Sequence, residues 1–137
     1  MKNVFQTTFG VPTGNCFGAC VASVLELEEI PDIDPAIPDE EEWRQRWHKF
    51  FASIGYEWTC TTYDEQNWGP WPKGYSVAHV LLAPGILHAL VMHDGVPIHD
   101  PLPGSPFLKL PPTEQRKHTI EGYSRFERIE ATANGTS

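Results

Sequence analysis

The chain has 137 residues, of which 40% are hydrophobic and 12% aromatic, and this length and composition predict one folded domain over residues 1–130 rather than a disordered chain. Its 18 acidic residues outnumber its 10 basic ones, giving a formal net charge of −8, and no basic cluster interrupts them, so neither nucleic acid nor membrane is expected as a partner. The N-terminal segment lacks the continuous apolar stretch of a signal peptide, and no apolar run is long enough to cross a membrane, which predicts a cytoplasmic protein.

Two helices are predicted in the first half of the chain. An apolar stripe at helical spacing predicts a first helix over residues 16–28, which ends before Pro31. Asp39 and Glu42 have the spacing of a capping box, and the apolar stripe that follows them continues to Ile54. A second helix is therefore expected over this stripe.

Strands are predicted in the second half, where aromatic, β-branched and apolar runs alternate with turn residues. Four segments have this character: residues 56–63, 86–92, 96–100 and 122–129. A long irregular loop over residues 64–73 follows the first of them. Helices followed by strands predict an α+β domain, with the helices packed on one antiparallel sheet. Residues 131–137 are small and polar, and are expected to form a flexible C-terminal tail.

The three cysteines, Cys16, Cys20 and Cys60, are an odd and small set, which argues against a disulfide framework. Cys16 lies at the first turn of the predicted helix, where unpaired backbone N–H groups and the positive end of the helix dipole favour a thiolate. Cys20 and Cys60 lack such a position and are expected to be small buried apolar side chains. Cys16 is therefore the candidate nucleophile, and it requires a base.

His88 is the candidate base, because an imidazole inside the apolar run ILHALVM requires a polar partner. In the hairpin that follows, a two-residue loop would place Asp100 opposite Ala89, whereas a three-residue loop ending at Gly95 places Asp100 opposite His88. We expect the three-residue loop with Gly95 at positive φ, because it gathers apolar side chains on one face and lets a carboxylate orient the imidazole. The alternative for Asp100 is structural, as the cap of a turn before Pro101.

Two segments, GNCFGACVASVL and HALVMHDGVPIHDP, resemble those of papain-like cysteine peptidases, most closely the compact bacterial type that processes leader peptides. In that type a cysteine begins a helix, and a histidine followed by aliphatic residues precedes an Asp-Pro pair. The resemblance implies a papain-like α+β fold whose N-terminal helix carries the nucleophile Cys16. It also implies that the sheet carries His88 as general base and acid and Asp100 as its orienting carboxylate. The chain's dimensions suit a virus-encoded or bacterial accessory protein.

The donor that would stabilise an oxyanion departs from the family pattern, in which a glutamine usually precedes the cysteine by six residues. This chain has Gly10 at that position, and Gln6 lies farther upstream. A longer turn between Gln6 and the helix would bring its amide back, and the backbone N–H of Cys16 would be the other donor. Asn15 is a rival donor, with helix capping as its alternative use.

Metal and cofactor sites are not expected, because the C-x3-C spacing of the first two cysteines is followed by no second pair of ligands. His79, like His48 and His118, is interpreted as a solvated side chain. Trp68 and Trp71 lie in the long loop beside glycine and proline, and are expected to wall a substrate cleft.

The resemblance implies acyl transfer on a protein or peptide substrate, or on a small amide. Hydrolysis of a peptide or isopeptide bond, deamidation and transamidation all use the same three groups. The alternative is a non-catalytic papain-like module that binds a partner protein, as an accessory or inhibitor protein does. Selective alkylation of Cys16 would distinguish the two classes.

Overall fold

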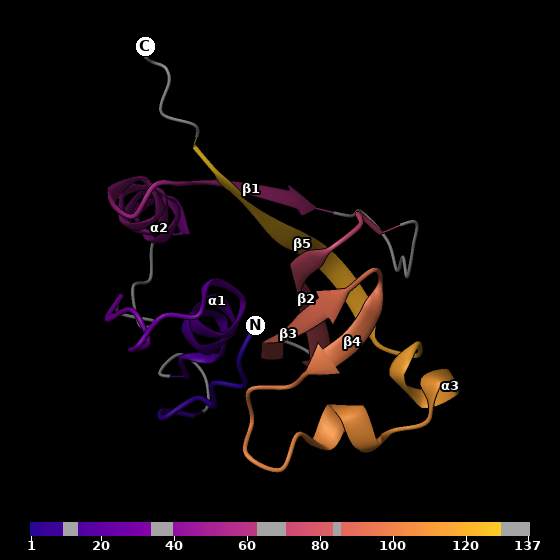
Figure 1. Cartoon of the computed structure of the whole chain (residues 1–137). Coiled ribbons are helices and arrows are strands. Elements are labelled where there is room, and N and C mark those ends of the chain that lie inside the picture. Colours follow the sequence, from indigo (N-terminus) through magenta and orange to yellow (C-terminus); the bar gives the residue numbers. More distant parts are fainter. Residues whose placement is uncertain (10–13, 34–39, 63–70, 84–85, 130–137) are drawn as a thin grey trace.

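A computed structural model of the chain describes residues 1–9, 14–33, 40–62, 71–83 and 86–129. The helices are α1 (Cys16–Leu25), α2 (Glu40–Ser53), the 3-10 helix η1 (Pro106–Lys109) and α3 (Pro112–Gln115). The strands are β1 (Tyr56–Thr62), β2 (Tyr75–Ala83), β3 (Ile86–His93), β4 (Val96–His99) and β5 (Thr119–Arg128). They form one five-stranded antiparallel sheet in the order β1-β5-β2-β3-β4 (Figure 1). The predicted α+β architecture, with an N-terminal helix and an antiparallel sheet, is confirmed.

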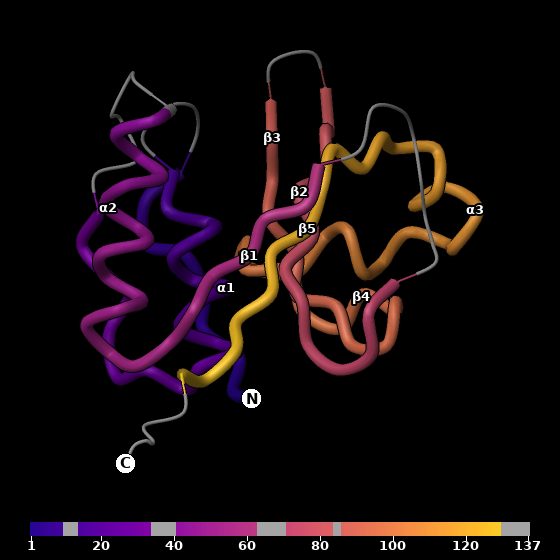
Figure 2. Tube along the Cα trace, turned by 90° about the horizontal axis from the view of Figure 1, so that it is seen from above, coloured from indigo at the N-terminus to yellow at the C-terminus, as the bar shows by residue number. Residues whose placement is uncertain are grey.

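The sheet has a core on each face. Figure 2 shows α1 and α2 on one side of the strands and the segment that carries η1 and α3 on the other. Alternation along β3 supplies both cores, since Ala89 and Val91 join the cluster under the helices while Leu90 and Met92 join the cluster on the opposite face. β3 is therefore covered on both faces, and a polar side chain in it needs a local partner.

Helix α1 is short and its middle is buried on all sides. Its residues from Phe17 to Ser23 are all buried, which small side chains such as Gly18 permit. The helix ends at Leu25, three residues before the predicted end, because Glu26 adopts the left-handed conformation at φ 55° and its N–H returns to the helix.

The N-terminal segment lies between α1 and the chain that follows β4. The Val4 N–H donates to Ser23 Oγ at 3.0 Å, and the Val4 carbonyl lies 2.7 Å from Nε2 of His99. The Gln6 N–H donates to the Pro101 carbonyl at 2.9 Å. These bonds place the Gln6 side chain beside the start of α1, although Gln6 precedes Cys16 by ten positions in the sequence.

β2 is absent from the predicted strands, yet it lies at the centre of the sheet. It pairs with β3 on one edge and with β5 on the other. Its buried residues include the consecutive Ser76, Val77 and Ala78, so polar and apolar positions do not alternate there. A strand covered on both faces lacks the period-two pattern by which strands are recognised.

The loop between β3 and β4 is shorter than predicted. His93 pairs with Val96, which leaves Asp94 and Gly95 as a two-residue loop with φ values of 50° and 81°. Two positive φ values are typical of a type I′ turn, whose twist matches that of the flanking strands. The three-residue loop is therefore wrong, while the positive φ of Gly95 is confirmed.

Asp100 reaches His88 from the chain that follows β4, a route that the sequence pattern does not show. The pairing shifts by one residue between Met92 and Val91, so that Ile98 is an extra residue in β4. The strand ends one residue before Asp100, which therefore leaves the sheet instead of pairing across it. The predicted opposition of His88 and Asp100 within the ladder is thus wrong, although the two side chains meet.

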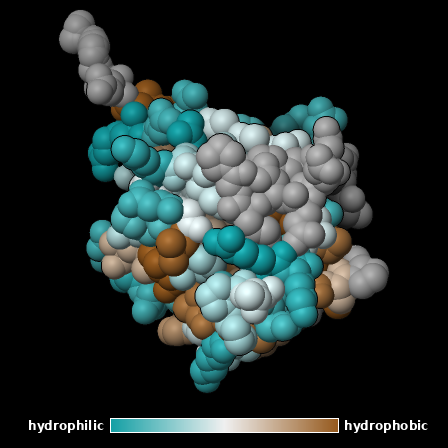
Figure 3. Space-filling view, turned by 90° about the vertical axis from the view of Figure 1, so that its right-hand side faces the viewer, coloured by the Kyte–Doolittle hydropathy of each residue, from teal (hydrophilic) through white to brown (hydrophobic). Residues whose placement is uncertain are grey.

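Some predictions concern residues outside the described ranges: the capping residue Asp39, the loop tryptophan Trp68 and the C-terminal tail. Within the described ranges, none of the helices combines the length and apolar character needed to cross a bilayer. The face over β4 and α3 is mostly hydrophilic, with hydrophobic residues in small separate groups (Figure 3). Groups of this kind are ordinary for an exposed protein surface.

Candidate active site

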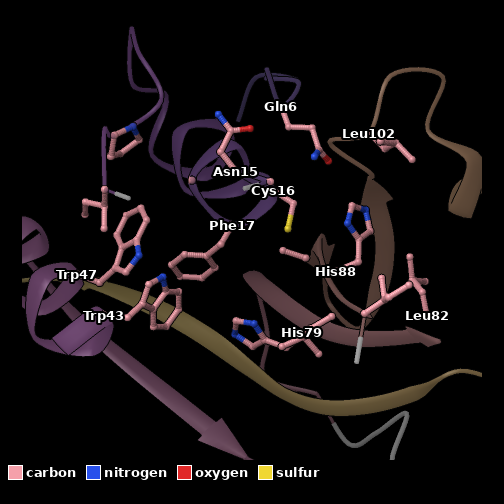
Figure 4. A pocket seen from close by; sticks show the side chains of 17 residues that line it. Gln6, Asn15, Cys16, Phe17, Trp43, Trp47, His79, Leu82, His88 and Leu102 are labelled. Atoms are coloured by element: carbon pink, nitrogen blue, oxygen red, sulfur yellow. The ribbon is translucent and has the colours of Figure 1, made fainter. Parts of the chain in front are cut away.

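A pocket of about 430 Å³ lies between the first turn of α1 and strands β2 and β3 (Figure 4). Two groups among its lining residues differ in chemistry. The polar end comprises Cys16, His88 and Gln6, with Asp100 behind His88. The aromatic end comprises Phe17, Trp43, Trp47 and His79. Cys16 and Phe17 are adjacent in α1, so the two ends share one helix turn.

Cys16 is the first residue of α1, and its side chain is partly exposed at the pocket. The first turn of a helix leaves its backbone N–H groups without acceptors inside the helix, and these groups stabilise negative charge nearby. The His88 ring lines the same pocket and interacts electrostatically with the Cys16 side chain. The thiol thus lies beside a helix N-terminus and an imidazole.

His88 bridges the thiol and a carboxylate. Its Nε2 lies 2.7 Å from Oδ1 of Asp100, which leaves Nδ1 for Cys16. Burial alone would lower the pKa of His88, but hydrogen bonds and charge interactions with Asp100 and Cys16 outweigh burial and raise it to about 9. His88 therefore carries a proton at neutral pH and holds a positive charge between two acidic groups.

The sequence leaves two roles open for Asp100, orienting the His88 ring and capping a turn. The Asp100 carboxylate makes the hydrogen bonds of both roles. Besides His88, it accepts hydrogen bonds from the Leu102 N–H at Oδ1 and from the Phe107 N–H at Oδ2, each at 3.0 Å. Burial would raise the pKa of Asp100, but these three bonds and the charge of His88 lower it below its usual value. The carboxylate therefore orients the imidazole and closes the backbone turn from β4 to η1 with the same two oxygens.

The other two cysteines lie in different surroundings. Cys20 is fully buried one helical turn after Cys16, and burial, together with the charges of Cys16 and Asp100, raises the pKa of its thiol. Cys60 is partly buried on β1, at the far side of β5 from β2. Of the three thiols, the structure places only Cys16 among the described residues that line the pocket.

The structure brings both candidate oxyanion donors to the pocket, in different arrangements. Gln6 is 6% exposed, and its Nε2 donates to the Thr8 carbonyl at 3.0 Å, leaving its second hydrogen available. Figure 4 shows the Gln6 amide above the gap between Cys16 and His88. This is the position from which an amide would reach an oxygen on the reacting carbon.

Asn15 instead holds the N-terminal segment in place. Its Oδ1 accepts hydrogen bonds from the Thr7 and Thr8 N–H groups at 3.0 and 3.1 Å, and its Nδ2 donates to Thr7 Oγ1 at 3.0 Å. It stands directly before α1 but makes no side-chain capping bond. Its bonds to residues 7 and 8 thus support the turn that returns Gln6 to the pocket.

The interpretation of His79 as a solvated side chain is wrong. It lines the pocket from β2, its ring stacks on Phe17 at 5.5 Å, and its Nε2 lies 2.8 Å from Ser124 Oγ. Burial, with a smaller effect of Arg44, lowers the pKa of His79 to about 4. The sequence does not indicate β2 as a strand, so it does not place this histidine on a face of the sheet.

The aromatic wall of the pocket also differs from the one expected. Trp71 does not line it, but packs on Tyr123 at 5.5 Å and beneath Gly95, in the cluster on the opposite face of the sheet. Trp43 and Trp47 of α2 line the pocket instead, with Trp47 also part of the core. Their helical spacing indicates core packing, and that spacing alone does not reveal a cavity beside them.

The described residues contain no group of three or more histidine, cysteine, aspartate or glutamate side chains placed to hold a metal ion. No protein-family model matches the chain, and neither a curated protein nor a solved structure matches it. The function is therefore argued from the pocket itself.

Proposed function

We propose that the chain is a thiol-dependent acyl-transfer enzyme of papain-like architecture, a cysteine peptidase or amidase whose nucleophile is Cys16. The observation that carries this proposal is His88, which contacts the thiol at the start of α1 and lies 2.7 Å from a buried carboxylate. A structural use alone would require only one of these two partners. A nucleophile beside a base, with a carboxylate hydrogen-bonded to that base, is the arrangement that acyl transfer uses.

In the first half-reaction the Cys16 thiolate attacks the carbonyl carbon of an amide or peptide bond. A C–S bond forms, and the carbonyl π electrons move to oxygen, where the N–H of Cys16 and the Gln6 amide stabilise the oxyanion. His88 then gives its Nδ1 proton to the amide nitrogen as the C–N bond breaks. The amine leaves, and the acyl group remains on sulfur as a thioester.

In the second half-reaction the now neutral His88 takes a proton from water, and the oxygen attacks the thioester carbon. The C–S bond breaks, its electron pair returns to sulfur, and the acid is released with Cys16 and His88 in their starting states. An amine in place of water would give transamidation through the same steps. Asp100 keeps Nδ1 of His88 directed at the reacting atoms throughout.

The test is the pH dependence of thiol alkylation, read by mass spectrometry of each cysteine peptide after treatment with iodoacetamide. We expect Cys16 to react faster than Cys20, Cys60 and a free thiol, with the largest advantage below pH 7, where an ordinary thiol is protonated. His88→Gln should abolish that advantage, while His93→Gln, at the end of β3 and outside the pocket lining, should retain it. Equal alkylation of Cys16 and a free thiol at pH 6 would contradict the proposal and favour a non-catalytic binding module.

A further inference from the structure

Among the described residues, one hydrogen bond fixes the side-chain amide of Gln6. Its Nε2 donates to the Thr8 carbonyl at 3.0 Å, while its Oε1 is buried and has no hydrogen-bond partner in the described part of the chain. A carbonyl oxygen only accepts hydrogen bonds, so the Thr8 carbonyl also determines which end of the amide carries the N–H groups. The direction of the second N–H of this amide therefore depends on the position of Thr8.

The position of Thr8 depends in turn on Asn15. Oδ1 of Asn15 accepts hydrogen bonds from the N–H groups of Thr7 and Thr8, and its Nδ2 donates to Thr7 Oγ1. The backbone N–H of Asn15 donates to the Thr8 carbonyl at 3.2 Å, so this carbonyl is shared between Asn15 and the Gln6 amide. Asn15 directly precedes Cys16, and these bonds therefore connect the amide to the neighbour of the thiol.

Separate contacts hold the backbone of Gln6. Its N–H donates to the Pro101 carbonyl at 2.9 Å, and the N–H of Val4, two residues earlier, donates to Ser23 Oγ at 3.0 Å. Neither bond involves Asn15. Removing the Asn15 side chain should therefore leave the N-terminal segment attached to the fold and release the Gln6 amide.

We infer that Asn15 is a positioning residue: it holds the Thr8 carbonyl so that the second N–H of the Gln6 amide is directed at the oxyanion that forms beside Cys16. This role rests on the proposed function, because an oxyanion forms there only if Cys16 attacks a carbonyl group. The role differs from helix capping, since Asn15 makes no side-chain capping bond to α1. Asn15 acts on the reacting oxygen, through Gln6, and not on the reactivity of the thiol.

The test compares two reagents that react at the Cys16 thiol of the full chain. In p-nitrophenyl acetate the thiolate attacks the carbonyl carbon: a C–S bond forms, negative charge develops on the carbonyl oxygen, and p-nitrophenolate leaves. In iodoacetamide the thiolate displaces iodide from a saturated carbon, and no oxyanion develops. The ratio of the acetylation rate to the alkylation rate, each corrected with the Cys16→Ala chain, measures oxyanion stabilisation separately from thiol reactivity.

We expect Gln6→Ala to lower this ratio about a hundredfold, the effect of removing one oxyanion donor. Asn15→Ala should lower the ratio at least about fivefold, because displacing a positioned group by about 1 Å can greatly reduce its effect on the rate. The alkylation rate alone should stay close to that of the wild type in both variants. In a chain that already carries Gln6→Ala, Asn15→Ala should have no further effect on the ratio, because the two residues act as one unit.

The chain offers a matched control in Ser23, which holds the same N-terminal segment at Val4 instead of at Thr8. Ser23→Ala should lower the melting temperature and leave the ratio within about twofold of the wild type, because it removes a hydrogen bond far from the amide. Should Asn15→Ala fail to fold, Asn15→Ser takes its place. Serine is favoured directly before a helix, but its shorter side chain does not reach both threonine N–H groups, so the same fall in the ratio is expected.

Three results would overturn the inference: an unchanged ratio in Gln6→Ala, a fall of less than about fivefold in Asn15→Ala, or a further fall when the two are combined. A ratio in Ser23→Ala as low as that in Asn15→Ala would also overturn it. Fast alkylation of Cys16 beside any of these results would leave the proposed function standing. A Cys16 that neither reagent modifies faster than a free thiol would overturn the proposed function, and the inference with it.

Discussion

The two ends of the pocket each contain a histidine largely enclosed by protein, and the two have opposite acid–base character. At the polar end, Asp100 and Cys16 raise the pKa of His88 to about 9 against the effect of burial. At the aromatic end, where the side-chain partner is the Ser124 hydroxyl, burial lowers the pKa of His79 to about 4. Residue type and burial therefore do not determine whether an enclosed histidine is protonated at neutral pH. The charge of its hydrogen-bond partner does.

This difference in pKa suits the two ends of the pocket to different chemical roles. The ring of His88 is protonated at neutral pH and can deliver a proton to a leaving group beside Cys16. The ring of His79 stays neutral over the same pH range and can only pack and hydrogen-bond. Substitutions at the polar end should therefore change rates, and those at the aromatic end should change affinity or stability.

The largest expected effect is that of Cys16→Ala, which should lower kcat/KM at least about a thousandfold, because no other group can form the thioester. The melting temperature should stay within a few degrees of the wild type, since the side chain is partly exposed at a helix end. Steady-state hydrolysis of a peptide substrate together with calorimetric melting measures both. Retained activity in this variant, or its loss in Cys20→Ala at an unchanged melting temperature, would show that the nucleophile lies elsewhere.

Asp100→Asn should impair both activity and folding. The new amide can keep an oxygen toward His88 but would turn N–H groups toward the N–H of Phe107, which now bonds to Oδ2. We expect kcat/KM to fall at least about a hundredfold and the free energy of unfolding to fall by about 2–4 kcal/mol. Urea unfolding and kinetics measure the two, with Asp94→Asn at the exposed turn as the control. A variant with native stability and native rate would remove both roles from Asp100.

The pKa shifts of His88 and His79 predict that the free energy of unfolding falls at both high and low pH. Each histidine accounts for one of these two limbs of the profile. The raised pKa of His88 stabilises the fold fully below pH 6.5, and this contribution is lost as pH rises toward about 9. The lowered pKa of His79 stabilises the fold above pH 6.5, and this contribution is lost as pH falls toward about 4. Each limb amounts to up to about 3 kcal/mol, so stability should be highest near pH 6.5.

Urea unfolding between pH 4 and pH 9 tests these limbs separately. His88→Gln should flatten the alkaline limb alone, and His79→Gln the acid limb alone. If both variants keep the wild-type profile, the contrast between the two ends of the pocket does not exist.

The smallest effect is expected for Ser124→Ala, which removes the hydroxyl partner of His79 and leaves the polar end untouched. The free energy of unfolding should fall by about 1 kcal/mol, the typical contribution of one neutral hydrogen bond. The alkylation rate of Cys16 should remain within about twofold of the wild type, as measured with iodoacetamide. A tenfold change in that rate would mean that the aromatic end controls the thiol, and the division of the pocket would fail.

The polar end could be predicted because each of its residues stands out locally. Cys16 begins a helix, His88 interrupts an apolar run, and Asp100 precedes a proline after a hairpin. The sequence predicts their meeting through the wrong pairing, because it does not decide between a two-residue and a three-residue loop and does not show the bulge at Ile98. A bulge is set by the twist and packing of the completed sheet, and leaves no pattern in the sequence.

The aromatic end could not be predicted, because its residues resemble ordinary core. Trp43 and Trp47 follow the helical period of a buried stripe, and His79 lies in β2, whose burial on both faces removes alternation. At the polar end, the sequence offers Gln6 as a donor but does not show the long-range bonds that hold it at the pocket, among them that of its N–H to the Pro101 carbonyl. Contacts between residues so far apart in the chain depend on the finished fold and leave no periodic signal.

The double use of the Asp100 carboxylate has a consequence for evolutionary descent. Because its oxygens hold the Leu102 and Phe107 amides as well as His88, a copy of this gene that lost the thiol would still need the aspartate to fold. Selection on stability alone would then preserve Asp100 in inactive descendants, while Cys16 and Gln6 drifted. Under the proposed function, we therefore expect the cysteine and the glutamine, and not the aspartate, to distinguish active from inactive copies.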